Sequence, residues 1–126
     1  MIWRIRERDV FARLSHEGHR ARAGVLWCTF LHDPSISPPQ VAFAIGRAIG
    51  SSVVRNRLRR RLRAALSASP PATQLAPGWY LIGARPGVVE LSFDRLTREL
   101  ADLGSAIDRQ ATRQAARALA GGSPGS

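Results

Sequence analysis

The sequence predicts an α+β fold in which helices pack on one small sheet as a two-layer α/β sandwich. Two observations lead to this fold class. The chain has 126 residues, of which 44% are apolar, so its length suits a single domain with one core. Short runs of strand-forming residues also occur among longer runs in which apolar residues recur every three or four positions. Helices gathered on a sheet of this size form two layers.

The first half of the chain is expected to form one helix and at least two strands. These segments cover residues 8–16, 22–32 and 41–45. The helix places Val10, Phe11 and Leu14 on one side, and Gly18 ends it. The longer strand is rich in β-branched and aromatic residues, whereas the prolines of residues 35–39 exclude a central strand there.

The second half is expected to form a helix, a strand and a closing helix. These segments are a helix from Ser51 or Ser52 to about Ala68, a strand over residues 79–85 and a helix from Ser92. Serine is a favoured N-cap for both helices, and Ser69-Pro-Pro71 ends the first. The closing helix has apolar residues at helical spacing, namely Phe93, Leu96, Leu100, Leu103 and Ile107.

We expect a single domain over residues 1–109. Residues 110–126 are rich in alanine and then in glycine, serine and proline. They either extend the closing helix or form a disordered tail, and residues 121–126 are expected to be loose.

The charge of the chain is strongly basic and unevenly placed. The net charge is +10, and all 19 basic residues are arginine. Residues 34–89 contain eight arginines and no acidic residue, whereas an ordinary solvated surface mixes both signs. Such an excess repels itself unless a polyanion binds it, so the candidate partners are nucleic acid, an anionic membrane surface or an acidic protein. Arginine suits phosphate binding, but a biased genome would give the same usage.

The helix expected from residue 51 onward carries the clearest functional pattern. At about 100° per residue, one apolar stripe is formed by Val54, Leu58, Leu62, Ala65 and Leu66. The far side carries Asn56, Arg57, Arg60 and Arg63. Arg59 and Arg61 border the stripe, and Arg55 lies within it in the first turn, where its long side chain still reaches solvent. Because no acidic residue lies four positions from these arginines, the helix is expected to present a cationic ridge.

A phosphate backbone suits this helix better than a membrane does. A membrane-surface helix would carry a broader apolar face with bulky aromatic residues, whereas this stripe contains only Val, Leu and Ala. Phosphate binding releases counterions and weakens steeply with salt. Asn56 adds a donor and an acceptor for a sugar or base edge. A DNA-binding role is less favoured, because one basic helix without a helix-turn-helix pair or dimer seam lacks the usual docking frame.

Residues 41–63 combine a strand, a glycine turn and the arginine helix in the order Val41-Ala-Phe-Ala-Ile-Gly-Arg-Ala-Ile-Gly-Ser-Ser-Val-Val-Arg-Asn-Arg-Leu-Arg-Arg-Arg-Leu-Arg63. This order resembles the bacterial ribonuclease P protein family. Asp9-Val-Phe11 followed by Gly18 resembles the first helix and turn of that family. Residues 78–86 resemble its last strand, and the helix from Ser92 resembles its closing helix. The resemblance covers about residues 3–108.

The resemblance implies a mixed sheet with a left-handed βαβ crossover around the arginine helix, although crossovers are generally right-handed. It implies a protein that binds the catalytic RNA of ribonuclease P and the single-stranded 5′ leader of precursor tRNA, which the enzyme removes. The residues that match the family's RNA-binding positions are Arg47, Arg55, Asn56, Arg57, Arg59, Arg60 and Arg63. Those that match the leader cleft, between the first helix and the sheet, are Phe11, Arg13 and either Thr29 or, one residue later, Phe30.

Three positions depart from the family pattern. Ser15 stands where many members carry a second aromatic residue, Gly46 where serine is commoner, and Ala48 where a basic residue is commoner. These changes affect the leader side more than the arginine helix. Phe11 is either a platform on which a leader base stacks or an ordinary core residue.

No catalytic residues are expected in this chain. Two-metal phosphodiester chemistry needs converging carboxylates, and the basic region has none. His16, His19 and His32 lack the spacing of metal ligands, and Cys28 is expected in or near the core. The resemblance implies that hydrolysis belongs to the RNA subunit, with Mg²⁺ held by that RNA and the substrate.

The expected partners are the catalytic RNA and precursor tRNA, with no membrane and no obligate protein partner. A single cysteine, the lack of an apolar run long enough to span a membrane and the lack of a secretory signal favour a cytoplasmic protein. The alternative function is a stand-alone RNA-binding or ribosome-associated module, which would have no preference for precursor over mature tRNA. Fold alone does not choose between the two.

Overall fold

The structure is a computed structural model that describes residues 3–4, 8–68 and 75–121. Its elements in chain order are β1 (Trp3–Arg4), α1 (Arg8–Glu17), β2 (His19–Ala23), β3 (Leu26–His32), β4 (Gln40–Ala44), α2 (Ser52–Leu66), β5 (Gly78–Ala84) and α3 (Phe93–Gly121). Two short 3-10 turns, η1 (Arg47–Ile49) and η2 (Pro86–Glu90), precede α2 and α3. The predicted helices and the strands at residues 41–45 and 79–85 are present, the strand predicted over residues 22–32 is divided into β2 and β3, and β1 is an additional strand.

The strands form one five-stranded sheet in the order β1-β4-β5-β3-β2. β1, β4 and β5 pair in parallel, whereas β3 pairs antiparallel with both β5 and β2. The sheet is therefore mixed, and α2 connects the parallel neighbours β4 and β5. The register places Cys28 opposite Ile82 and Thr29 opposite Leu81. Because consecutive residues of a strand point to opposite faces, this register decides which side chains reach each face.

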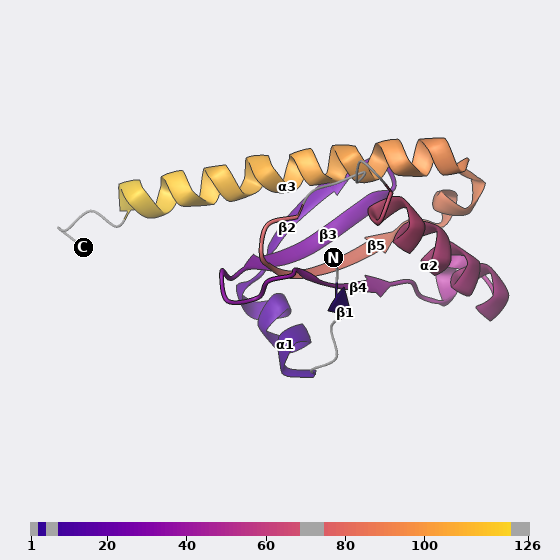
Figure 1. Cartoon of the computed structure of the whole chain (residues 1–126), viewed down its shortest axis with the longest axis horizontal. Coiled ribbons are helices and arrows are strands. Elements are labelled where there is room, and N and C mark those ends of the chain that lie inside the picture. The colour runs from indigo at the N-terminus through magenta and orange to yellow at the C-terminus, as the bar shows by residue number, and fades with distance from the viewer. Residues whose placement is uncertain (1–2, 5–7, 69–74, 122–126) are drawn as a thin grey trace.

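Helices cover both faces of the sheet (Figure 1). The long α3 lies across one face, and α2 packs against α3 at one end of the molecule. α1 packs on the other face, against β3 and β5. The α+β class and the packing of helices on a mixed sheet are confirmed. The sheet and the α2–α3 layer are the two expected layers, and α1 adds a short third layer on the opposite face.

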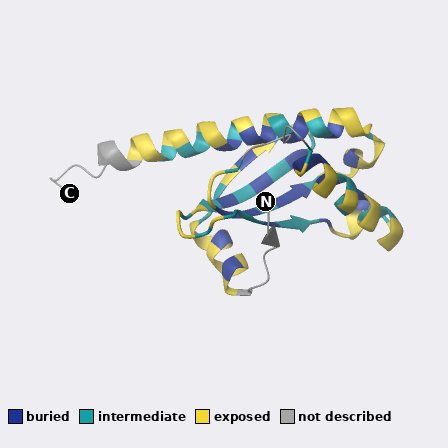
Figure 2. Cartoon of the chain, in the orientation of Figure 1, coloured by how far each residue is buried: buried dark blue, intermediate teal, exposed yellow. Residues whose placement is uncertain are grey.

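The main core lies between the sheet and the α2–α3 layer. Its fully buried side chains include Phe30, Tyr80, Ile82, Leu58, Leu62, Leu96, Leu100 and Leu103. A smaller cluster of Val10, Leu14 and Trp79 lies under α1. Figure 2 shows buried and exposed residues alternating along α2 and the first part of α3. Each buried leucine of this kind contributes about 1.5–3 kcal/mol, so packing on the sheet holds both helices.

The strand expected over residues 22–32 is two strands joined by a tight turn, so the prediction of one strand was wrong. Gly24 in this turn has φ of +58°, a conformation that residues with a Cβ rarely adopt. An ideal Cβ at Gly24 would collide with Oε1 of Glu99. That oxygen accepts a hydrogen bond from the backbone N–H of Val25 at 3.1 Å. The run of strand-forming residues thus contains a glycine turn, and Glu99 of α3 stabilises this turn by its hydrogen bond.

The two ends of the described chain also differ from what periodicity alone predicts. β1 has only two residues and therefore gives no sequence period. α3 continues without a break to Gly121, so residues 110–121 are helical. Residues 122–126 of the expected tail and residues 69–71, expected to end α2, lie outside the described residues. No helix within the described ranges is long and apolar enough to cross a membrane.

Candidate nucleic-acid interface

α2 begins at a serine cap and docks its apolar stripe on the sheet. Ser51 is the N-cap, and its hydroxyl accepts a hydrogen bond from the backbone N–H of Val54 at 3.4 Å. Leu58 and Leu62 are at most 2% exposed, and the rest of the predicted stripe is buried or half-buried. The packing of this stripe sets which side of α2 faces solvent.

The solvent side of α2 carries the predicted polar and cationic side chains. Its exposed members, which we call the α2 ridge, are Asn56, Arg57, Arg60 and Arg63. Arg59 and Arg61, predicted to border the stripe, are half-buried. The exposed side of α2 is visible at one end of the molecule in Figure 2. The division of the helix expected from about 100° per residue is confirmed.

Two of the six arginines of α2 hold the helix in place. Arg59 donates to Oδ1 of Asn56 at 3.0 Å and to the backbone carbonyl of Ile45 at 3.3 Å. Arg61 donates to the backbone carbonyl of Leu91, just before α3. Charge-assisted hydrogen bonds are stronger than neutral ones, so these contacts fix α2 to the end of β4 and to the start of α3. Arg59 is therefore less available to a ligand than its sequence position indicated.

Arg55 and Arg63 are partly engaged. Arg55 donates to Oγ of Ser52 at 3.2 Å, and its Nε is buried with no partner among the described residues. Its side chain is half-buried, as expected for an arginine within the stripe. The guanidinium of Arg63 lies 6.0 Å from the ring centroid of Phe43 and stays exposed, so it remains open to a phosphate.

Arg57 and Arg60 are the free pair of the α2 ridge. Both are exposed, and neither makes a hydrogen bond or an ion pair with any described residue. Their guanidinium groups keep all their donors available, and a phosphate accepts two such donors side by side. A polyanion therefore meets the least competition at these two positions.

Arg47 lies in η1, between β4 and α2, and is exposed. Gly46 and Ala48, two of the departures from the family pattern, are exposed beside it. An ideal Cβ at Gly46 would meet no atom within 4 Å, and φ there is −93°. The backbone therefore does not require glycine at this position, so the departure serves no packing need.

Thr29 and Phe30 point to opposite faces of the sheet. Phe30 is 1% exposed and stacks on Tyr80, with 6.3 Å between ring centroids. Thr29 is half-buried on the α1 face, where an ideal Cβ on Gly18 would lie 2.8 Å from its Cγ2. The alternative that placed Phe30 in the cleft is wrong, because the strand register turns its ring into the main core.

Phe11 is 37% exposed, whereas Val10 and Leu14 of the same helix are at most 3% exposed. The alternative of an ordinary core residue is therefore contradicted. At about 100° per residue, Phe11 and Gly18 lie on the same flank of α1, and Gly18 closes against Thr29. The helical angle thus directs Phe11 toward the flank of α1 on which Gly18 follows the helix.

Arg13 lies on the opposite flank of α1 from Phe11, about 200° away around the helix. Its Nε is 3.1 Å from Oε2 of Glu17, and its guanidinium lies 4.9 Å from the ring centroid of Trp79. An exposed ion pair of this kind contributes at most about 1 kcal/mol. Phe11 and Arg13 therefore lie on opposite flanks of α1, and Thr29 lies beside Gly18, just after the C-terminal end of this helix.

The face that carries Thr29 also holds residues that the sequence analysis did not single out. A hollow of about 440 Å³ is lined by Arg20, Arg22, Trp27 and Arg85, which we call the open sheet face, together with Ala21 and Leu26. The guanidinium of Arg20 lies 5.4 Å from the ring centroid of Trp27. The indole rests on Gly83, where an ideal Cβ would collide with the ring. A flat aromatic surface is thus flanked by three cationic side chains.

Strand alternation could have found the open sheet face. Trp27 is two residues before Thr29 in β3, so both side chains share a face. Arg20 and Arg22 pair with Thr29 and Trp27 across β2–β3 and lie on that face as well. The pattern was missed because residues 22–32 were taken as one strand.

Neither the single cysteine nor any group of potential metal ligands forms a reactive site among the described residues. Cys28 is fully buried, as expected, and burial raises the pKa of its thiol, which keeps it protonated and inert. Within the described part of the chain, no three His, Cys, Asp or Glu side chains gather as metal ligands would.

Comparison with known proteins gives a consistent result. The model of the Ribonuclease P family matches residues 2–118 of this chain. The RNase P protein of Staphylococcus aureus superposes with a TM-score of 0.70 at 16% identity, covering 80% of this chain and 91% of that one. The RNase P protein of Thermotoga maritima gives a TM-score of 0.70 at 18% identity, covering 81% and 96%. No curated protein sequence matches the chain.

Proposed function

Because the chain belongs to the ribonuclease P protein family, we propose that it is the protein subunit of ribonuclease P. In this role it binds the catalytic RNA and the 5′ leader of precursor tRNA. It thereby promotes endonucleolytic removal of the leader, which gives the mature 5′ end of the tRNA. The family and the fold support a place in a ribonuclease complex.

The α2 ridge is the observation that carries the RNA-binding part of the proposal. Arg57 and Arg60 are exposed and unengaged among the described residues, while Arg59 and Arg61 hold the helix rigid beneath them. A cationic surface fixed in this way binds phosphates without first having to order its own backbone. Each phosphate contact releases counterions, so the affinity for the catalytic RNA should fall steeply with salt.

The leader part of the proposal involves Phe11, Thr29 and the open sheet face. Single-stranded RNA is bound by aromatic surfaces on which bases stack and by cations along its backbone. Trp27 offers such a surface beside Arg20 and Arg22, and Phe11 borders the same face from α1. Ser15 and Thr29 lack an aromatic ring. Trp27, two residues before Thr29 in β3 and on the same face, supplies one.

We assign hydrolysis to the RNA subunit. The residues of the α2 ridge and the open sheet face are cationic or neutral and do not fit Mg²⁺, which prefers carboxylate and phosphate oxygens. We therefore place Mg²⁺ with the RNA and the substrate. The contribution of this chain is to screen phosphate repulsion, so that the assembled enzyme works at a lower magnesium concentration.

The test is the salt dependence of binding to a bacterial ribonuclease P RNA. We expect the double variant Arg57→Ala/Arg60→Ala to bind more weakly and to flatten the slope of log affinity against log salt by about 1 per arginine. The matched control is Arg95→Ala/Arg98→Ala, which removes the same charge from α3 near the acidic residues Asp94 and Asp102. An unchanged slope in the α2 variant would remove the ridge from the proposal. Equal affinity of the assembled enzyme for precursor and mature tRNA would favour the stand-alone module instead.

A further inference from the structure

α3 continues past the end of the sheet. Ala111 is its last described apolar residue that packs on the main core, yet the helix runs on to Gly121. In Figure 1 this end of α3 projects beyond the sheet, at the opposite end of the molecule from α2. A helix of 29 residues is about 44 Å long. Residues 112–117 bury little apolar surface, so core packing does not explain this part of the helix.

One flank of the projecting part carries arginine at every fourth position. Arg109, Arg113 and Arg117, which we call the α3 ridge, are exposed. Successive members are about 40° apart around the helix, so all three share one side. None of them makes an ion pair or a hydrogen bond with another described residue. Like charges four positions apart destabilise a helix, which indicates that a ligand supplies the opposite charge.

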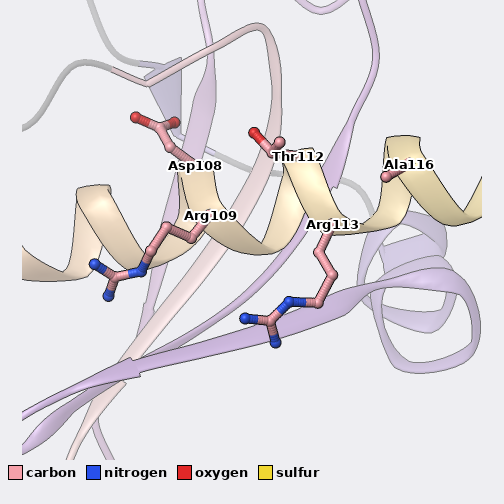
Figure 3. Close-up of a pocket in the computed structure, with 5 residues that line it drawn as sticks. All are labelled: Asp108, Arg109, Thr112, Arg113 and Ala116. Carbon is pink, nitrogen blue, oxygen red and sulfur yellow. The ribbon is translucent and has the colours of Figure 1, made fainter.

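The nearest acidic residue does not neutralise this flank. Asp108 is the last acidic residue of the chain. Figure 3 shows Arg109 and Arg113 pointing to one side of α3, whereas Asp108 and Thr112 point to the other. The α3 ridge therefore repeats the arrangement of the α2 ridge: free guanidinium groups with no acidic residue among them.

The composition of the flank restricts the kind of partner. Residues 108–117 contain no aromatic residue and no apolar residue larger than alanine. This stretch therefore offers neither a stacking surface for unpaired bases nor the broad apolar face that inserts into a membrane. The hollow drawn in Figure 3 is lined by side chains of one helix alone, so it has no second wall to enclose a small molecule. The partner that fits is a phosphate backbone presented by base-paired RNA.

We infer that the α3 ridge is a second contact with the catalytic RNA, on a base-paired segment distinct from the one that the α2 ridge binds. This inference rests on the proposed function. α3 lies on the face of the sheet opposite α1 and the open sheet face, so a leader bound on the α1 face leaves the α3 ridge free for the RNA subunit. The α3 ridge is connected to the α2 ridge because α2 packs against α3. Once one ridge has bound the RNA, the other therefore meets it at a high effective concentration.

The test compares Arg109→Ala/Arg113→Ala with the same control pair, Arg95→Ala/Arg98→Ala, in the full chain. Alanine keeps the helix, which circular dichroism verifies. For binding to the ribonuclease P RNA alone, without tRNA, we expect a loss of affinity on the order of tenfold and a salt slope lower by about 2 in the α3 variant. Arg109→Lys/Arg113→Lys should restore most of the affinity that the alanine variant loses, because a lysine ammonium also binds phosphate, as a point charge.

Each outcome separates this inference from the proposed function. Loss of binding in the α2 variant with unchanged binding in the α3 variant would overturn the second contact and leave the subunit assignment intact. If the α3 variant bound the RNA subunit normally and the assembled enzyme bound only tRNA more weakly, the α3 ridge would contact the substrate. That result would overturn the inference. Salt-sensitive binding of the α3 ridge to vesicles of anionic lipid, with unchanged RNA affinity, would also overturn it. If the unaltered chain failed to bind the RNA at all, the proposed function itself would fail.

Discussion

The two faces of the sheet are formed by the same strands but differ in burial. On one face Cys28, Phe30 and Tyr80 are at most 1% exposed beneath the α2–α3 layer. On the other face Trp27 and Thr29 stay half-buried, because α1 covers only part of that face. Neighbouring residues of β3 therefore alternate between a dry core and an open, cationic surface.

This difference shows how a small protein can keep aromatic and cationic side chains available for a ligand. The covered face supplies most of the buried apolar surface, which is the main source of stability. The open face can then leave an indole and several guanidinium groups without a covering helix. Four predictions test this division, in order of decreasing expected effect.

The largest expected effect is on the covered face. Phe30→Ala should lower the free energy of unfolding by about 3–5 kcal/mol, because it leaves a cavity in the main core. The adjacent change Thr29→Ala, on the open face, should alter it by no more than about 0.5–1 kcal/mol. Chemical denaturation of both variants measures the contrast, and equal losses would show that the two faces are not divided in this way.

The turn that sets the register should matter next. Gly24→Ala should lower the free energy of unfolding by about 2 kcal/mol, because it strains a left-handed backbone position and displaces Glu99 from the N–H of Val25. Gly46→Ala is the matched control, because its Cβ meets open space at a negative φ. The control should be neutral or slightly stabilising, by up to about 1 kcal/mol. A neutral Gly24→Ala would contradict the role given to this turn.

On the open side, Phe11→Ala should act on selectivity rather than on folding. If a leader base stacks on this ring, affinity for precursor tRNA should fall by about 1–3 kcal/mol, with affinity for mature tRNA unchanged. Ser15→Ala, on the same helix and without a ring, is the control. Equilibrium binding of the two tRNAs to the assembled enzyme measures the effect. Reduced stability with unchanged selectivity would show that Phe11 supports the fold and does not bind the leader.

The smallest expected effect is a pH dependence at the end of β3. The ring of His32 lies against Phe30 and Tyr80, with centroids 5.1 and 5.8 Å away. Burial lowers the pKa of His32 below 6.5, opposed by the charge of Asp108 and reinforced by that of His19. The folded state then binds fewer protons than the unfolded state between the lowered pKa and 6.5. The free energy of unfolding should therefore fall as pH drops through that window.

Denaturation at several pH values between about 7.5 and 5.5 checks this dependence. His32→Gln should reduce the slope, whereas His16→Gln, on the exposed side of α1, should leave it unchanged. An identical slope in His32→Gln and the unaltered chain would assign the pH dependence to other groups.

The sequence was sufficient to predict α2, because the 3.6-residue period of a helix alone determines which of its residues share a face. The apolar stripe and the ridge followed from the angle between residues, and every exposed position of the ridge agreed. What the period could not indicate is which arginines are engaged. Arg59 and Arg61 bind the carbonyls of Ile45 and Leu91, residues that only the tertiary fold brings close.

The open sheet face was missed for a related reason. Its composition depends on the register of β2 and β3, and a shift by one residue reverses every side chain. That register is set at Gly24, which Glu99 contacts from a helix 75 residues further along the chain. The choice between Thr29 and Phe30, and the position of Trp27 beside Arg20, therefore needed the three-dimensional structure.

Leader cleavage tests the claim that this chain is the protein subunit of ribonuclease P. Precursor tRNA is incubated with a bacterial ribonuclease P RNA at low magnesium, with and without this protein. We expect the protein to restore cleavage at the mature 5′ end under conditions where the RNA alone is inactive. Absence of cleavage, despite salt-sensitive binding to a cognate RNA, would contradict the claim and favour a stand-alone RNA-binding module.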